Sequence, residues 1–186
     1  MSTPFDRQFW EDRYASAHAV WSGEPNPNLV AEVAGLEPGD ALDAGAGEGA
    51  DAVWLAGKGW RVKAVDFSAT ALERAATRGS DVDWERADLT EWSPEPASYD
   101  LVSAQYLHLP GLAEVLPRLG AGVRPGGILL VVGHERSDAH PFPELCYPAK
   151  EMAGWLDDGW EILISEPRPG RESTRRDEVL KARRRA

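Results

Sequence analysis

The chain has one cysteine, no long apolar run and too few basic residues to balance its acidic ones. Because Cys146 stands alone, no disulfide can form within the chain and no metal site can be assembled from several cysteines. No window approaches the roughly 18 consecutive apolar residues that span a bilayer. Residues 1–10 carry charges where a secretory signal has its apolar run. We therefore expect a cytoplasmic protein with no membrane partner and no metal site.

Positive charge is also scarce, since 20 Lys and Arg face 31 Asp and Glu, which gives a formal net charge of −11. A field of that sign repels phosphate backbones, so nucleic acid is not an expected partner. Basic residues do gather between Arg168 and Arg185. We interpret that stretch as a solvated edge strand and tail.

Short apolar runs alternate with helical patterns along the chain. Strands are predicted over 41–47, 60–66, 82–87, 99–105, 128–133, 160–165 and 177–183, and helices over 49–58, 69–78, 112–121 and 148–159. This alternation indicates a mainly parallel sheet covered by helices on both faces. The last two strands have no helix between them and should pair antiparallel. With no internal linker or repeat, residues 1–186 predict a single α/β domain.

A glycine-rich loop, Asp43-Ala44-Gly45-Ala46-Gly47-Glu48-Gly49, follows the first predicted strand and opens a helix. Glycines let the chain turn sharply there and let a ligand approach the backbone closely. The spacing Gly45-x-Gly47-x-x-Ala50 also fits the fingerprint of dinucleotide-binding proteins. The loop therefore predicts a nucleotide-like ligand and leaves its identity open.

Two further aspartates follow the next strands. Asp66 ends the second predicted strand, where a carboxylate can accept hydrogen bonds from ribose hydroxyls. Asp88 follows the third strand and can face an adenine amino group, beside the backbone N–H of Leu89. A single aspartate at a strand end is usually a turn former or helix cap. Acidic residues at three successive strand ends, with Asp43 the first, favour a nucleoside-containing ligand.

Together these motifs resemble those of class I S-adenosylmethionine-dependent methyltransferases. That family carries Asp/Glu-x-Gly-x-Gly-x-Gly after its first strand, an acidic end to the second and Ala-Asp or Gly-Asp after the third. The resemblance extends through the segment 99–105 and the turn Pro125-Gly126-Gly127. It implies a Rossmann-like three-layer sandwich with a seven-stranded, mostly parallel sheet, an antiparallel last strand and the order 3-2-1-4-5-7-6.

The resemblance also implies the cofactor, S-adenosyl-L-methionine, and the residues that bind it. Gly45 and Gly47 would line its methionine part, with Gln105 bordering the ammonium. The remaining core positions implied are Asp43, Asp66 on the ribose, Phe67 and Leu89 flanking the adenine, and Asp88 at its amino group. Carboxylates near the cationic ammonium and sulfonium are also electrostatically favourable.

Aromatic residues precede the first strand. Trp10 and Tyr14 lie four residues apart, so they share one face of a short helix, and Trp21 follows. This segment is similar to the opening of the thiopurine and tellurite-resistance methyltransferases. The similarity implies that Trp10 and Tyr14 contact the methionine end and that Trp21 faces the acceptor. Residues 1–40 then form a lid and a helix over a core of residues 41–186, although a helix that merely packs on the domain is the alternative.

Methyl transfer from a sulfonium is a direct displacement, which a base assists when the acceptor carries a proton. His108 and His134 follow the fourth and fifth strands and are the candidates for that base, with a binding or structural role as the alternative for each. His140 and His18 carry less weight. The tellurite-resistance relatives have a histidine near the last hairpin, and residues 167–174 contain none.

The implied function is methyl transfer to a small-molecule acceptor by a monomer or homodimer. An NAD(P)-dependent oxidoreductase explains Gly45, Gly47 and Asp66 but leaves Asp43 and Asp88 without a role. A non-catalytic methyltransferase-like binding module is the remaining alternative.

Overall fold

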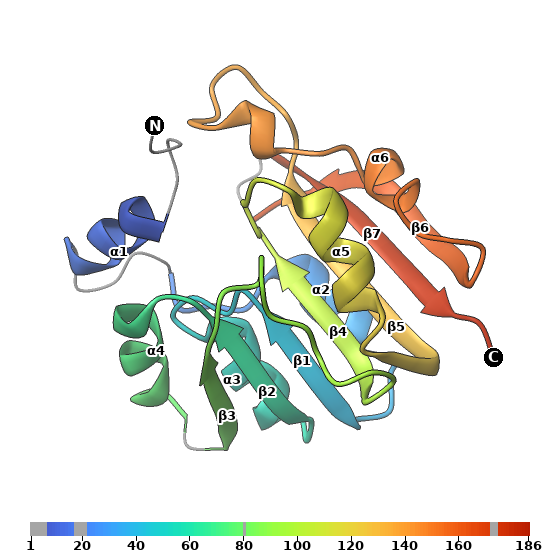
Figure 1. Ribbon diagram of the computed structural model, residues 1–186, viewed down its shortest axis with the longest axis horizontal. Helices are drawn as coiled ribbons and strands as arrows, with labels where there is room; N and C mark the ends of the chain where they lie inside the picture. Colours follow the sequence, from blue (N-terminus) through green and yellow to red (C-terminus); the bar gives the residue numbers. More distant parts are fainter. Residues whose placement is uncertain (1–6, 17–21, 80, 172–174) are drawn as a thin grey trace.

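Seven strands form one mixed sheet in the part of the chain that the structure describes, residues 7–16, 22–79, 81–171 and 175–186 of this computed structural model. The strands are β1 (Asp40–Ala44), β2 (Arg61–Asp66), β3 (Val82–Arg86), β4 (Tyr99–Gln105), β5 (Val123–His134), β6 (Trp160–Pro169) and β7 (Arg176–Arg184). Their order is β3-β2-β1-β4-β5-β7-β6, so the predicted fold class and strand order are confirmed (Figure 1).

The direction of the strands also follows the prediction. The pairs β1–β2, β1–β4, β2–β3 and β4–β5 are parallel, whereas β7 runs antiparallel to both β5 and β6. Because β7 lies between β5 and β6, the expectation that the arginine-rich end forms an edge strand is wrong. The described edges of the sheet are β3 and β6.

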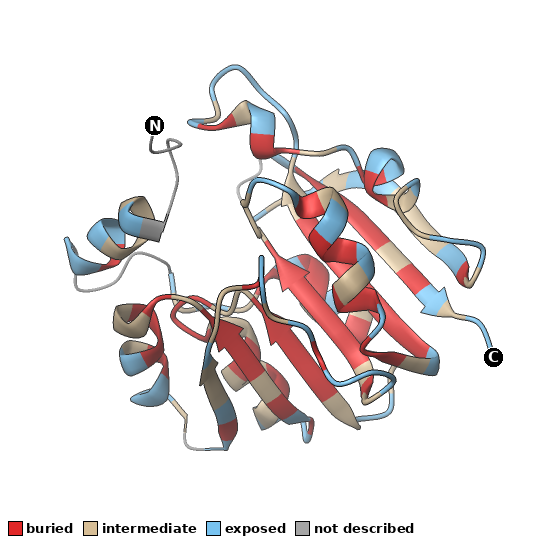
Figure 2. Cartoon of the chain, in the orientation of Figure 1, coloured by how far each residue is buried: buried red, intermediate tan, exposed pale blue. Residues whose placement is uncertain are grey.

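Helices cover both faces of the sheet. They are α1 (Arg7–Ala15), α2 (Pro27–Val33), α3 (Ala50–Gly57), α4 (Ala69–Ala76), α5 (Leu112–Gly120), α6 (Ala149–Ala153) and the 3-10 turn η1 (Pro143–Leu145). Apolar residues of α2 and α3 pack on one face, and those of α5 and α6 on the other. The central strands β1 and β4 between these layers are almost entirely buried, whereas the edge strands β3 and β6 are mostly half-buried or exposed (Figure 2). None of the described helices has the length and apolar character to cross a bilayer.

The helix predicted over 148–159 is much shorter than expected. It ends at Ala153, with Gly154 as its C-cap, and a turn leads from there into β6. In contrast, β4 spans the predicted residues 99–105, all of which are buried except Asp100. The error in the predicted length of this helix therefore concerns an element at the side of the sheet and leaves the central strands unchanged.

The order of the strands determines where a ligand can bind. From β1 the chain moves to β2 and β3 on one side, then crosses to β4 on the other side of β1. The loops after β1 and β4 consequently diverge, which leaves a crevice at the carboxyl ends of these two strands.

Candidate functional site

A cavity of about 680 Å³ opens at this crevice. Its walls come from the ends of β1 to β5, from α1, and from segments on either side of β5 and β7. The lining includes Trp10, Tyr14, Gly45, Gly47, Asp51, Asp66, Phe67, Asp88, Leu89, Gln105, His108, His134, His140, Phe142 and Arg171. Of the sequence-predicted site residues, all but Asp43 and Trp21 are in this lining, and Trp21 lies outside the described residues.

The glycine loop adopts a backbone that requires glycine. Gly45 has φ +79°, Gly47 φ +52° and Gly49 φ +80°. The N–H groups of Gly45 and Ala46 both donate to the carbonyl of Val65 in β2, over 2.8 and 3.1 Å. A Cβ atom on Gly45 would lie 2.8 Å from Leu107 Cδ1. A side chain at this position would therefore strain the turn and narrow the cavity.

Asp66 holds the glycine loop from the end of β2. Its Oδ2 accepts the N–H of Gly47 over 2.8 Å, and its Oδ1 accepts the N–H of Ser68 over 2.9 Å. The carboxyl is buried, and this burial raises its pKa. Each carboxylate oxygen has a second lone pair, so the predicted ribose contact remains compatible with this bracing role. Sequence reasoning assigned Asp66 to the ligand and did not foresee its bonds to the loop.

Two buried acceptor atoms next to the loop have no donor among the described residues: Asp43 Oδ2 and Gln105 Oε1. Asp43 is 1% exposed, and burial raises the pKa of its carboxyl well above the usual range, with Asp51 and Asp66 adding to the effect. Gln105 Nε2 donates to Ser103 Oγ over 2.9 Å. Buried acceptors without donors are unfavourable, so Gln105, the one of the two that lines the cavity, suits a ligand with N–H groups.

Phe67, Asp88 and Leu89 line the same cavity beside the ends of β2 and β3. Asp88 Oδ1 accepts both the N–H and the hydroxyl of Thr90, over 2.9 and 2.7 Å. Asp88 Oδ1 is therefore held by the turn that runs from Asp88 to Thr90. This fixes the carboxylate and so orients its second oxygen relative to the apolar side chain of Leu89.

Helix α1 is attached beside the cavity through Glu11. Its carboxylate accepts from Ser68 Oγ over 3.0 Å and from the N–H of Ala69 over 3.1 Å, at the start of α4. This places Trp10 and Tyr14 in the cavity wall. The Trp10 ring meets Phe142 edge-on at 6.0 Å between centroids, so α1 approaches the segment after β5 across the cavity.

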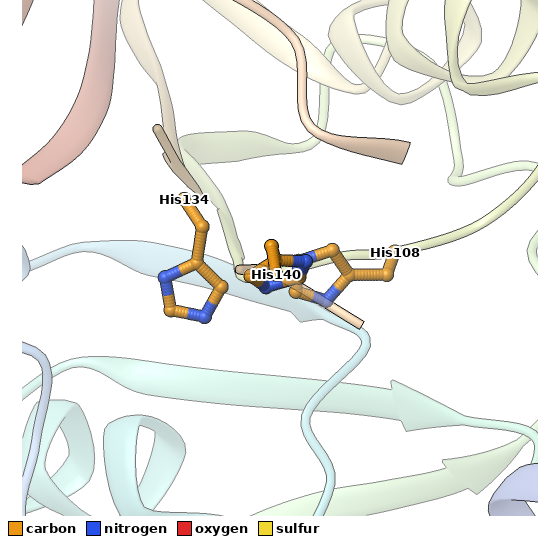
Figure 3. A group of neighbouring side chains, drawn as sticks. All are labelled: His108, His134 and His140. Carbon is orange, nitrogen blue, oxygen red and sulfur yellow. The ribbon is translucent and has the colours of Figure 1, made fainter. Parts of the chain in front are cut away.

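Three histidines meet at the end of the cavity near β4 and β5 (Figure 3). His108 follows β4, His134 ends β5 and His140 lies in the loop that leads to η1. The ring centroids are 5.2 Å apart for His108–His134, 5.3 Å for His108–His140 and 5.0 Å for His134–His140. Sequence reasoning gave His140 little weight, because a loop position has no periodicity that would predict its neighbours.

Burial, with a smaller contribution from the neighbouring His134 and His140, lowers the pKa of His108 to about 3. A group with so low a pKa is a weak proton acceptor at neutral pH, which argues against His108 as a general base. Burial also lowers the pKa of His140. The pKa of the buried Cys146 thiol is raised to about 11, so this cysteine is not an activated nucleophile.

Asp177 is a site residue that sequence reasoning missed. It is 1% exposed, and its Oδ2 accepts from Tyr106 Oη over 2.8 Å and from Asn28 Nδ2 over 3.0 Å. Tyr106 has φ +51°, an uncommon backbone for a bulky residue, and its ring stacks on His134 at 4.0 Å. Asp177 therefore joins α2, the end of β4 and the start of β7 behind the histidines.

The arginine-rich segment contributes to the site as well. Arg171, Arg175 and Arg176 belong to the cavity lining. Arg171 donates to the carbonyls of Glu24 and Pro25, over 2.8 and 2.6 Å, so part of the segment predicted as a solvated tail closes one side of the cavity.

Comparison with known proteins places the glycine loop within a recognised domain. A family described as "Methyltransferase domain" matches residues 41–127. A trans-aconitate 2-methyltransferase from Azoarcus sp. (strain BH72) is 33% identical over 127 residues, which cover 66% of this chain and 49% of that protein. Another from Pseudomonas paraeruginosa (strain DSM 24068 / PA7) is 31% identical, over 83% of this chain and 50% of that protein. The chain thus spans about half the length of the curated relatives it matches.

Solved structures share the fold over nearly the whole chain. The N-methyltransferase NodS from Bradyrhizobium japonicum WM9, in complex with S-adenosyl-L-homocysteine, has a TM-score of 0.75 at 18% identity, over 94% of this chain and 96% of that one. A protein described as converting a disulfide bond into a thioacetal group during echinomycin biosynthesis has a TM-score of 0.72 at 26% identity. The match covers 96% of this chain and 92% of that chain.

Proposed function

We propose that this chain, which belongs to the class I S-adenosylmethionine-dependent methyltransferase superfamily, binds S-adenosyl-L-methionine and transfers its methyl group to a small-molecule acceptor. The observation that carries the proposal is Gln105 Oε1, a buried acceptor in the cavity lining near the glycine loop that has no donor among the described residues. An ammonium group has three N–H donors, and this oxygen can accept one of them. The matches to methyltransferases favour this activity over the oxidoreductase alternative.

The residues present fit such a cofactor from end to end. Gly45 and Gly47 leave room for the methionine part, since neither carries a side chain over the loop. Asp66 offers its remaining lone pairs to ribose hydroxyls, and Phe67 and Leu89 provide apolar surface for an adenine. The cavity, at about 680 Å³, is in the range of small-ligand sites.

When bound, the cofactor supplies a methyl group on a positively charged sulfur. The task of the chain is then to align the acceptor with that methyl group and to keep water out. Alignment of two reactants is worth about 7–11 kcal/mol. Trp10, Tyr14 and Phe142 are placed to exclude water, and the aromatic faces favour a cation nearby by about 0.5–2 kcal/mol.

The acceptor end of the cavity suits a small molecule that carries negative charge. Arg171 and Arg176 line the cavity and donate to the backbone carbonyls of Glu24, Pro25 and Pro167, and Arg171 is also attracted by the carboxylate of Asp51. Two of the similar proteins are methyltransferases of trans-aconitate, an organic anion. Nucleic acid is an unsuitable acceptor because the chain carries a net charge of −11.

Calorimetry tests the cofactor first. S-adenosyl-L-methionine and S-adenosyl-L-homocysteine should bind with one site per chain, and NAD should not bind. Methyl transfer from labelled cofactor is then measured with a panel of small carboxylic acids and, in parallel, with tRNA. Binding of NAD alone would contradict the cofactor assignment, and efficient methylation of tRNA would contradict the acceptor class.

A further inference from the structure

The geometry points to a binding site for a divalent transition-metal ion, held by His108, His134 and His140. One ring nitrogen from each of the three lies within 4.8 Å of the others (Figure 3). The three residues come from the end of β4, the end of β5 and the loop before η1. The fold therefore brings together ligands that are far apart in the sequence, and two of them, His134 and His140, lie outside the residues 41–127 that match the family.

The separation of the nitrogens is close to what a metal requires. Zinc binds imidazole nitrogen at about 2.0–2.1 Å in a tetrahedral arrangement, which puts neighbouring nitrogens about 3.3 Å apart. Each ring would have to move inward by about 1 Å at most. All three side chains are half-buried rather than locked in the core, so small rotations about their side-chain bonds achieve this.

The donor set also defines the class of metal. Neutral imidazoles suit zinc, copper, nickel and cobalt, whereas magnesium and calcium prefer oxygen ligands. Three protein ligands leave one coordination position open, as in sites where the metal also binds a small molecule. Because the histidines line the cavity, that position faces the space left for the acceptor.

A buried carboxylate behind one of the rings can orient it as a metal ligand. His134 Nδ1 lies 3.7 Å from the carboxylate of Asp177, which leaves Nε2 of that ring for the metal. His140 Nδ1 accepts the N–H of Phe142 over 3.3 Å and lies 3.4 Å from Cys146 Sγ, so this ring is oriented by its own loop. Carboxylates behind metal-binding imidazoles serve this purpose in many proteins.

The role of the metal rests on the proposed function. A doubly charged ion with neutral ligands would attract an anionic group of the acceptor, a thiolate or a carboxylate, to its open position. The acceptor would then be held in its deprotonated form, and the chain would need no general base at His108.

Zinc binding to the full chain tests the site directly. The protein is stripped with a chelator, dialysed and titrated with ZnCl₂ by calorimetry. We expect one ion per chain, and a loss of affinity of at least about 100-fold in His140→Ala and in His108→Ala, since even indirect partners of a metal are worth about 10–100-fold. His18→Ala is the control, because it removes the remaining histidine and keeps the three proposed ligands.

Two results would overturn the proposal: no zinc binding by the unmodified chain, or an equal loss in His18→Ala and His140→Ala. S-adenosyl-L-homocysteine affinity is measured on the same samples. A variant that keeps this affinity is folded, so its loss of zinc reports on the metal site alone. Failure of the unmodified chain to bind S-adenosyl-L-homocysteine would contradict the proposed function. The metal site would then still be judged by zinc binding alone.

Cobalt provides a test of the open position. Co²⁺ replaces Zn²⁺ in such sites and gives visible absorption that depends on its ligands. We expect 2-mercaptoethanol to add a sulfur-to-cobalt charge-transfer band in the loaded protein and to add none in His140→Ala. A spectrum of the loaded protein that 2-mercaptoethanol leaves unchanged would contradict a position accessible from the cavity.

Discussion

Asp66 and Gly47, separated by the whole of α3 and β2, are joined by a hydrogen bond of 2.8 Å from the glycine N–H to the buried carboxylate. The residue predicted to bind the ligand thus also fixes the loop that the ligand would contact. The side chain of Asp66 therefore both supports the glycine loop and is expected to contact the ligand, so a substitution at Asp66 affects both.

Asp66→Ala should weaken S-adenosyl-L-homocysteine binding and also destabilise the free protein. The substitution removes the acceptor for the N–H groups of Gly47 and Ser68, and each unsatisfied buried donor costs about 1–3 kcal/mol. Calorimetry and thermal melting measure the two effects. Asp158→Asn, a change at an exposed residue in the turn before β6, is the control and should alter neither. A variant with normal affinity would contradict the assignment of Asp66.

Glu11→Gln should loosen α1 without unfolding the core. The substitution weakens the charge-assisted hydrogen bonds from Ser68 and Ala69, through which α1 is attached to α4. Amide hydrogens of residues 7–16 should exchange faster in the variant, and S-adenosyl-L-homocysteine should slow exchange there if α1 closes over the ligand. Asp12→Asn, on the same helix with an exposed partner in Gln8, is the matched control. Equal exchange with and without ligand would make α1 a simple packing element.

Asp51 should make the ligand-free protein less stable as the pH rises. Burial raises the pKa of this carboxyl to about 6, above its ordinary value of 3.8. The folded chain therefore binds a proton more tightly than the unfolded chain, so the contribution of Asp51 to stability falls between about pH 4 and pH 6. Asp51→Asn removes this dependence and should stabilise the protein at pH 7 by up to about 3 kcal/mol.

Denaturant unfolding at pH 4, 5, 6 and 7 measures that effect. The free energy of unfolding of Asp51→Asn should rise relative to that of the unmodified chain with each step in pH. Asp157→Asn, which changes an exposed carboxylate that accepts from the N–H of Gly159, should show the same pH dependence as the unmodified chain. If the free energies of unfolding of Asp51→Asn and the unmodified chain differ by the same amount at all four pH values, the pKa of Asp51 is not raised.

Asp177→Asn should destabilise the fold by about 1–3 kcal/mol. The change weakens the bonds that Tyr106 and Asn28 donate to a nearly inaccessible carboxylate. Glu161→Gln, which weakens an exposed pair with Arg183, should shift stability by less than about 1 kcal/mol. Thermal melting of the two variants gives the comparison, and a smaller loss for Asp177→Asn than for Glu161→Gln would show that the buried bonds contribute little.

The sequence predicted the central strands and the glycine loop because their signals are local. The strand predicted over 128–133 is an apolar run within β5, and the loop from Gly45 to Gly49 requires positive φ angles that favour glycine. The position of the last strand was not a local signal. The polar composition of the arginine-rich end predicted an edge strand, whereas the family resemblance implied the observed order, in which β7 pairs with both β5 and β6.

The histidine cluster and Asp177 could not be found in the same way. His140 lies in a loop, so no period relates it to His108 or His134. Asp177 reaches the site because β7 runs antiparallel to β5. The register of this pair places Asp177, at the start of β7, opposite His134, at the end of β5. Contacts of this kind depend on the assembled sheet and have no signature within a short window.

The reversed direction of β7 divides the cavity into two parts of separate origin. One part of the lining comes from residues up to Thr90, around α1 and β1 to β3, and the other from Gln105 onward, including the start of β7. Changes in the second part can alter the chemistry of what is bound there while the glycine loop and Asp66 keep their bonds. This architecture lets acceptor preference evolve, or be redesigned by exchanging the segments after β5 and before β7, as an independent module.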